Sequence, residues 1–198
     1  MSLEIPKGPF EAYLFDCDGT LADTMPLHFI AWQRALAPHS CDFPESLFYE
    51  WGGKPTRRIV ADLNELQDLK MDAESIEEER EGFYLEQLHT VKPVVSVVEF
   101  LLGLPKETKK AVVSGGPTES VSKTLKLLEL SKHFEHLICS EDYTHGKPHP
   151  DCYLEAAKRL EVNPERCLVF EDAATGVKAA LAAGMQCVRV PNALGNKK

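Results

Sequence analysis

YLFDCDGTLADT, residues 13–24, joins an apolar run to two aspartates, Asp16 and Asp18, which are followed by Gly-Thr. In an extended chain, side chains two residues apart point the same way, so both carboxylates can face one site. Two like charges at that spacing are costly unless a cation or a proton lies between them. Asp-Gly is also a common turn dipeptide. Taken alone, these residues fit a solvated surface turn as well as a catalytic pair.

The apolar run is the first of five strand-like segments. Short apolar runs without polar alternation are typical of parallel strands that are covered on both faces. We expect them over residues 12–15, 110–113, 137–139, 167–170 and 187–190. Between the later ones, Pro117 and Pro150 stand at the starts of helical patterns, and a helix over residues 175–183 is expected to end at Gly184. This alternation predicts an α/β fold, a doubly wound, Rossmann-like parallel sheet.

Three further segments place reactive or charged residues beyond the expected strands. They are VVSGG at residues 112–116, GKP at 146–148 and VFED at 169–172. Each alone is more often structural: a turn, a solvated loop lysine, or negative charges at a helix N-terminus. In doubly wound sheets, however, ligands bind beyond the carboxyl ends of the strands, and all these segments fall there. Their joint occurrence with Asp16 and Asp18 indicates one site.

In this order, the four segments resemble the motifs of the haloacid dehalogenase superfamily, the Mg2+-dependent aspartyl phosphotransferases, over nearly the whole chain. The resemblance implies that Asp16 is the nucleophile and that Asp18 is the general acid and base. It implies a phosphoryl site made of Ser114, the amides of Gly115 and Gly116, and Lys147. It also implies Mg2+ held by Asp16, the backbone carbonyl of Asp18 and Asp172, with Glu171 as a direct ligand or a partner through water.

Residues 25–92 do not follow the alternation of strands and helices. They read as helices only, over residues 27–37, 56–69 and 73–90. Such an insert resembles the helical cap of the family's phosphosugar branch, so we expect a catalytic core of residues 1–24 and 93–198 and a cap of residues 25–92. The same resemblance implies cap contacts with the active site or substrate from His28, Gly53, Lys54, Thr56, Arg57 or Arg58. A histidine packed in a helix and solvated surface cations are the structural alternatives.

The branch contains both phosphatases and β-phosphoglucomutases. Where mutases tend to carry Val after Asp-x-Asp-Gly, this chain has Thr20, and the mutase cap arginine is displaced from position 56 to Arg57 and Arg58. We therefore expect a Mg2+-dependent phosphatase acting on a small phosphate monoester, a sugar phosphate, through an aspartyl phosphate, with the mutase as the alternative. A phosphate-responsive binding protein on the same scaffold would be expected to lack Asp16 or Asp18. A dehalogenase would need neither Asp18 nor residues 171–172.

Composition limits the partners. The 198 residues are 43% hydrophobic and 27% charged, with a formal net charge of −9, which is typical of a globular protein. Because no basic stripe is present, we expect neither nucleic acid nor a membrane as a partner. The resemblance implies a small phosphorylated metabolite instead, and we expect a monomer or weak homodimer. The N-terminus lacks a signal-peptide pattern, and the six cysteines form no CxxC pair, so a cytoplasmic protein with reduced thiols is expected. Cys17 should face away from Asp16 and Asp18 and be buried.

Overall fold

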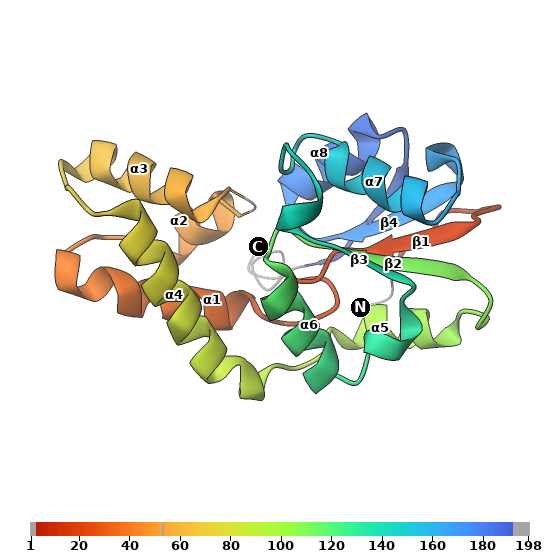
Figure 1. Cartoon of the computed structure of the whole chain (residues 1–198), viewed down its shortest axis with the longest axis horizontal. Helices are drawn as coiled ribbons and strands as arrows, with labels where there is room; N and C mark the ends of the chain where they lie inside the picture. The colour runs from red at the N-terminus through yellow and green to blue at the C-terminus, as the bar shows by residue number, and fades with distance from the viewer. Residues whose placement is uncertain (1–2, 53, 192–198) are drawn as a thin grey trace. The chain divides into compact units, whose positions relative to one another are not determined.

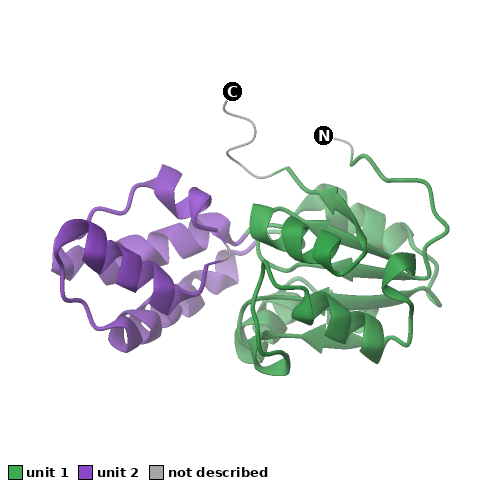
Figure 2. Ribbon diagram, turned by 90° about the horizontal axis from the view of Figure 1, so that it is seen from above, with its two compact units in different colours: residues 1–23, 92–198 green, residues 24–91 purple. Residues whose placement is uncertain are grey.

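The structure, a computed structural model, describes residues 3–52 and 54–191. The chain divides into two compact units, which Figure 2 colours separately. Residues 1–23 and 92–198 form the first, here called the core unit, and residues 24–91 form the second, the helical unit. The sequence predicts divisions after residues 24 and 92.

The core unit is built on one parallel sheet. Its five strands are β1 (Ala12–Phe15), β2 (Lys109–Val113), β3 (His136–Ile138), β4 (Cys167–Glu171) and β5 (Gln186–Arg189). They are ordered β3-β2-β1-β4-β5, and every neighbouring pair is parallel. The predicted α/β doubly wound sheet is therefore confirmed, with strand ends that differ from the expected ones by at most one residue. β1 and β4 are central, and they bring the acidic segments at residues 16–18 and 171–172 to neighbouring strand ends.

Helices cover both faces of this sheet (Figure 1). The helices α7 (Asp151–Arg159) and α8 (Ala174–Ala182) lie on one face, and α5 (Val95–Gly103) and α6 (Thr118–Leu127) lie on the other. Side chains alternate along each strand, so Leu14 and Val169 pack in the first apolar cluster while Phe15 and Phe170 pack in the second. The Phe15 and Phe170 rings stack with centroids 4.8 Å apart. Short 3-10 turns complete the unit at Ser131–His133, Ser140–Asp142 and Pro164–Arg166.

The helical unit has its own core. It consists of α1 (Met25–Leu36), α2 (Glu45–Glu50), α3 (Thr56–Gln67) and α4 (Ala73–Gln87), with 3-10 turns at Ala37–His39 and Leu88–Thr90. Aromatic side chains fill one of its clusters, namely Trp32, Phe43, Phe48 and Trp51. The sequence predicts α1, α3 and α4 but misses α2, because six residues between Pro44 and Trp51 are too few to show a helical period.

The two passages of the chain between the units run side by side in the core unit. Asp23 N–H donates to the carbonyl of Lys92 at 2.8 Å, and Val94 N–H donates to the carbonyl of Leu21 at 3.0 Å. Ala22 and Pro93 form an antiparallel bridge between these bonds. The helical unit is thus inserted immediately after the loop that holds Asp16 and Asp18. Among the described residues, no helix combines the length and apolar character needed to cross a membrane.

Candidate active site

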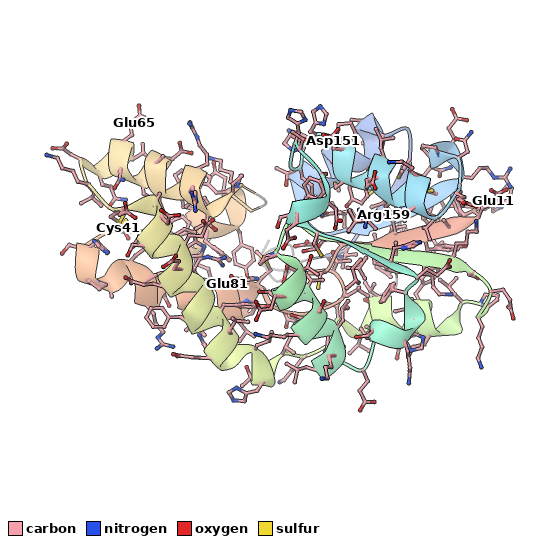
Figure 3. All side chains as sticks on the ribbon, viewed as in Figure 1. Glu11, Cys41, Glu65, Glu81, Asp151 and Arg159 are labelled. Carbon is pink, nitrogen blue, oxygen red and sulfur yellow. The ribbon has the colours of Figure 1, made fainter. Side chains whose placement is uncertain are left out.

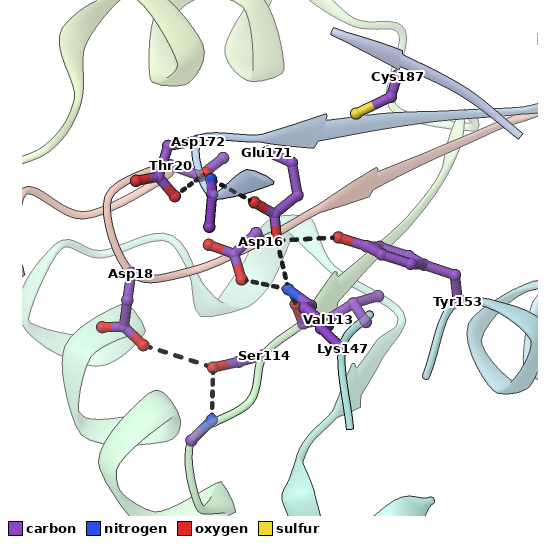
Figure 4. Close-up of polar contacts among 12 residues, drawn as sticks. Asp16, Asp18, Thr20, Val113, Ser114, Lys147, Tyr153, Glu171, Asp172 and Cys187 are labelled. Carbon is purple, nitrogen blue, oxygen red and sulfur yellow. Dashed lines mark hydrogen bonds and ion pairs between the residues drawn. The ribbon is translucent and has the colours of Figure 1, made fainter. Parts of the chain in front are cut away.

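The carboxyl edge of the sheet gathers the polar residues that the sequence singles out. Asp16 follows the last residue of β1, Ser114 follows β2, and Glu171 ends β4. Because all strands are parallel, these ends share one edge, and Lys147 reaches it from the loop before α7. Figure 4 shows the Lys147 ammonium directed at the Asp16 and Glu171 carboxylates.

Lys147 connects the acids of two strands. Its Nζ lies 2.7 Å from Asp16 Oδ1 and 2.6 Å from Glu171 Oε1, and it donates to the carbonyl of Val113 at 3.2 Å. Glu171 Oε1 also accepts from the Tyr153 hydroxyl at 3.3 Å, and Oε2 accepts from the backbone N–H of Ala173 at 2.8 Å. Both Glu171 oxygens are therefore engaged within the protein. The side chains of the ion pairs are at most 8% exposed, so water screens them little.

Asp172 lies against the loop that follows Asp18. Gly19 has a φ of +81°, and a Cβ added there would lie 2.5 Å from Asp172 Oδ2. The Thr20 hydroxyl is 3.5 Å from Asp172 Oδ1. Glycine is required at position 19 for two reasons: the left-handed backbone and the close approach of the carboxylate. The Gly-Thr pair of the first motif thus positions the side chain of the residue that follows β4, more than 150 residues further along the chain.

Ser114 lies next to Asp18. Its hydroxyl is 3.5 Å from Asp18 Oδ2, and the N–H of Gly116 donates to Ser114 Oγ at 3.0 Å. The Gly116 amide, which the resemblance implies at the phosphoryl group, thus contacts the serine hydroxyl in this structure. The Tyr143 hydroxyl donates to the carbonyl of Ser114 at 3.0 Å, which holds the backbone of the turn after β2 in place.

Burial shifts the titration of the cluster. Burial raises the pKa of Asp16 well above its usual value; Lys147 opposes this rise, and the neighbouring carboxylates add to it. Burial, followed by the charge of Glu171, raises the pKa of Asp172 to about 7. Burial alone would lower the pKa of Lys147, but Asp16 and Glu171 raise it well above the usual lysine value. The single ammonium leaves an excess of negative charge in this site, which a further cation would neutralise.

The acids of this cluster also lie close enough together for a metal ion to bind among them. One oxygen from each of Asp16, Glu171 and Asp172 lies within 4.8 Å of the others, and all three residues are buried. Carboxylate oxygens suit hard cations such as Mg2+, Mn2+ or Ca2+. The donor chemistry and the excess of negative charge therefore both fit a hard divalent metal.

Two residues that support the site were not identified from the sequence. Tyr153 was assigned only to the apolar face of its helix, yet its hydroxyl contacts Glu171. Gly176 lies inside α8, where an added Cβ would overlap the Glu171 carboxylate. A tyrosine on an apolar stripe and a glycine within a helix are the signals available, since each is unfavourable there without a structural reason.

The predicted cap residues lie within the helical unit. His28 stacks on Tyr84 with centroids 4.0 Å apart, and its Nδ1 is 3.1 Å from Arg80. Lys54 Nζ lies 3.2 Å from Asp62 and 4.0 Å from the centroid of the Trp51 ring.

The remaining predicted residues belong to the start of α3. Thr56 is its first residue. Arg57 pairs with Glu77 at 2.6 Å and with Glu74 at 3.1 Å, and Arg58 pairs with Asp62 at 2.9 Å. Gly53 lies outside the described residues.

The cysteines are free thiols. Cys17 has no exposed surface and packs in the apolar cluster with Phe15 and Phe170, which confirms that it faces away from Asp16 and Asp18. Burial raises the pKa of its thiol well above the usual value. Cys17 is therefore a packing residue of the core.

Known proteins resemble this chain in sequence and in fold. The family model of haloacid dehalogenase-like hydrolases matches residues 10–184. A phosphorylated carbohydrates phosphatase of Thermotoga maritima is 33% identical over 89% of this chain and 82% of its own length. A fructose-1-phosphate phosphatase of Escherichia coli is 32% identical over 91% of this chain and 96% of its own length. The crystal structure of a β-phosphoglucomutase from Clostridium difficile superposes with a TM-score of 0.82 at 25% identity, covering 96% of this chain and 88% of that one.

Proposed function

The chain belongs to the haloacid dehalogenase-like hydrolases, and from that premise we propose that it is a Mg2+-dependent phosphatase of a small phosphate monoester, a sugar phosphate. The observation that carries the proposal is the buried contact of Lys147 with Asp16 and Glu171, beside Asp18 and Ser114. Buried charge of this kind is costly to maintain, and it is concentrated where a dianionic phosphoryl group would be handled.

In the first step, a carboxylate oxygen of Asp16 attacks phosphorus. The O–P bond to Asp16 forms as the bond from phosphorus to the leaving alkoxide breaks, and Asp18 donates its proton to that alkoxide. Lys147 orients the Asp16 carboxylate through Oδ1 and offsets its charge. The product of this step is an aspartyl phosphate and a free alcohol.

In the second step, Asp18 works in the opposite direction. As a carboxylate it takes a proton from water, the water oxygen bonds to phosphorus, and the bond to Asp16 breaks to release inorganic phosphate. The Ser114 hydroxyl, 3.5 Å from Asp18 Oδ2, can contact Asp18 or a phosphoryl oxygen, and the Gly115 amide can donate to the same group. Asp16 is regenerated, so atoms and charge balance over the cycle.

The metal would be held by Asp16, Asp172 and the backbone carbonyl of Asp18. When bound, Mg2+ supplies positive charge that lets the phosphoryl oxygens approach the carboxylates. Glu171 has both oxygens engaged with Lys147, Tyr153 and the Ala173 amide, so we assign it to holding Lys147 in place and not to the metal. Gly19 keeps the space in which the Asp172 carboxylate lies.

We assign the helical unit the role of a substrate-selecting cap. Its insertion directly after the loop of Asp16 and Asp18 supports this role, as does the presence of phosphatases of small sugar phosphates among the relatives. His28 is held by Tyr84 and Arg80, which gives its ring a defined orientation in the unit. Lys54 and Thr56 would then affect the choice of ester more than the rate of phosphoryl transfer.

The mutase is the second candidate, supported by the similarity to β-phosphoglucomutase. A mutase must hold the second phosphate of a bisphosphate, which calls for a cation on the cap. Arg57 already pairs with Glu74 and Glu77, Arg58 with Asp62, and Lys54 with Asp62. These pairings, together with Thr20 in the first motif, favour the phosphatase.

A phosphorus NMR time course separates the two functions. The protein is incubated with Mg2+ and a panel of sugar phosphates, including fructose 1-phosphate and β-glucose 1-phosphate with a trace of the bisphosphate. We expect inorganic phosphate to accumulate. Conversion of the 1-phosphate into the 6-phosphate with little free phosphate would instead identify a mutase, and no reaction with any ester would contradict both.

A further inference from the structure

A second group of metal-binding side chains lies outside the active site, on the loop that leads into α7. His145, His149 and Asp151 each offer one ligand atom, and these atoms lie within 4.8 Å of one another. The other such group among the described residues is the acidic cluster of the active site. Figure 3 labels Asp151 at the start of α7 in the core unit. The proposed phosphatase chemistry makes no use of these three side chains.

The Asp151 carboxylate bridges the two imidazole rings. His145 Nδ1 is 2.8 Å from Asp151 Oδ2, and His149 Nδ1 is 2.8 Å from Oδ1. The ring centroids are 4.6 Å apart. In a tetrahedral zinc site with bonds of about 2.0–2.1 Å, neighbouring ligand atoms lie about 3.3 Å apart. Small rotations of the two exposed histidines would therefore convert these contacts into a set of ligands.

We propose that His145, His149 and Asp151 form a second divalent-metal site, for ions that prefer imidazole, such as Zn2+, Co2+ or Ni2+. Two nitrogens and one carboxylate oxygen suit these ions, whereas Mg2+ prefers oxygen ligands alone. Three protein ligands leave a coordination position for water. The loop and the acidic cluster would thus select different metals.

The place of this site in the chain gives it a consequence for catalysis. Residues 146–148, which include Lys147, lie between the two histidines, and Lys147 Nζ contacts Asp16. An ion bound to His145, His149 and Asp151 would close a ring around Lys147 and restrain the segment that holds it. This consequence rests on the proposed function; metal binding itself does not.

The test is a titration of the untagged full chain with Co2+ in the presence of excess Mg2+, monitored by the visible absorption of the bound cobalt. A second titration, with Zn2+, is monitored by calorimetry. We expect one bound ion per chain. Removal of one ligand, in His145→Ala or His149→Ala, should weaken binding by about tenfold or more. Asp172→Asn, which alters the acidic cluster, should leave this binding unchanged. His89→Ala should also leave it unchanged, because the exposed His89 ring contacts the backbone carbonyl of Glu86.

Thermal unfolding provides a second measurement. Zn2+ should raise the Tm of the wild-type chain and of His89→Ala but not that of His149→Ala, because an ion that binds only the folded state stabilises it. The proposal is wrong if both histidine variants bind Co2+ as the wild type does, or if binding disappears in Asp172→Asn. Absence of phosphatase activity would leave these binding results intact, so the two proposals fail separately.

Discussion

The charged residues of the core unit and of the helical unit are used in different ways. At the edge of the sheet, Lys147 pairs with Asp16, 131 positions away, and with Glu171, and all three are nearly inaccessible to water. On the helical unit, Arg57 pairs with Glu77, 20 positions away, with a side chain that is 58% exposed. Exposed pairs contribute little to stability, and buried charges are retained at a cost. The difference supports the proposed catalytic role of the first network, whereas the second network fits solubility and local helix contacts.

The largest contrast is expected in turnover. Asp16→Asn should lower kcat by at least about 10^4-fold, because the nucleophile is lost while the isosteric amide still accepts from Lys147. The matched change in the helical unit is Asp62→Asn, which also removes a carboxylate that pairs with a lysine. It should change kcat by less than about fivefold. Steady-state release of phosphate from the best ester measures both.

Circular dichroism and Tm control for folding in this pair. Asp16→Asn should keep a wild-type spectrum, since the residue removed is already disfavoured as a charged group by burial. If Asp16→Asn retained turnover near that of wild type, the nucleophile would lie elsewhere and the comparison between the two networks would lose its basis.

The second contrast is in stability. Lys147→Met leaves the carboxylates of Asp16 and Glu171 buried without their cation, so it should lower the free energy of unfolding by about 4 kcal/mol. Lys54→Met removes a lysine whose side chain is 36% exposed and should cost less than about 1 kcal/mol. Urea unfolding without metal gives both values. Equal losses would mean that burial does not distinguish the two networks.

Much of the fold and part of the site could be predicted from the sequence, because these features depend on residues that are close together in the chain. The apolar run before Asp16 predicts a strand from a few neighbouring residues. The two-residue spacing of Asp16 and Asp18 predicts that their carboxylates point the same way. The contact of Lys147 with Asp16 spans 131 positions, and only the resemblance to a known family anticipated it. Tyr153 could not be assigned because its ring packs as its apolar neighbours do, and only the folded chain shows its hydroxyl at Glu171.

The third contrast concerns pH. Asp172 has a pKa of about 7 in the folded, metal-free chain, against 3.8 as its ordinary value. The folded state therefore binds this proton more tightly than the unfolded state does, and the resulting stability is complete below about pH 4 and lost as the pH rises through about 7. Between about pH 5 and about pH 8, wild type in EDTA should lose about 2–3 kcal/mol relative to Asp172→Asn, which cannot titrate.

The metal reverses this loss if Asp172 is a ligand. Mg2+ at about pH 8 should raise the Tm of the wild-type chain more than that of Asp172→Asn. Asp62→Asn in the helical unit is again the control and should follow the wild type at every pH. If the stability of the wild type relative to Asp172→Asn did not change with pH, the raised pKa would be wrong. If Mg2+ raised the Tm of both chains equally, the ion would bind elsewhere.

The smallest contrast uses two glycines that lie inside helices. Gly176 of α8 has the Glu171 carboxylate where a Cβ would be, whereas Gly82 of α4 has nothing within 4 Å of that position. Gly176→Ala should therefore cost about 2 kcal/mol, because Glu171 must move away from Lys147. Gly82→Ala should stabilise by about 0.5–1 kcal/mol, because alanine loses less backbone entropy in a helix. The same substitution would thus have opposite signs in the two units. If Gly176→Ala were stabilising and left kcat undiminished, the position of Glu171 would not depend on this glycine. The active-site network would then accept an added methyl group as readily as the exposed position at Gly82 does.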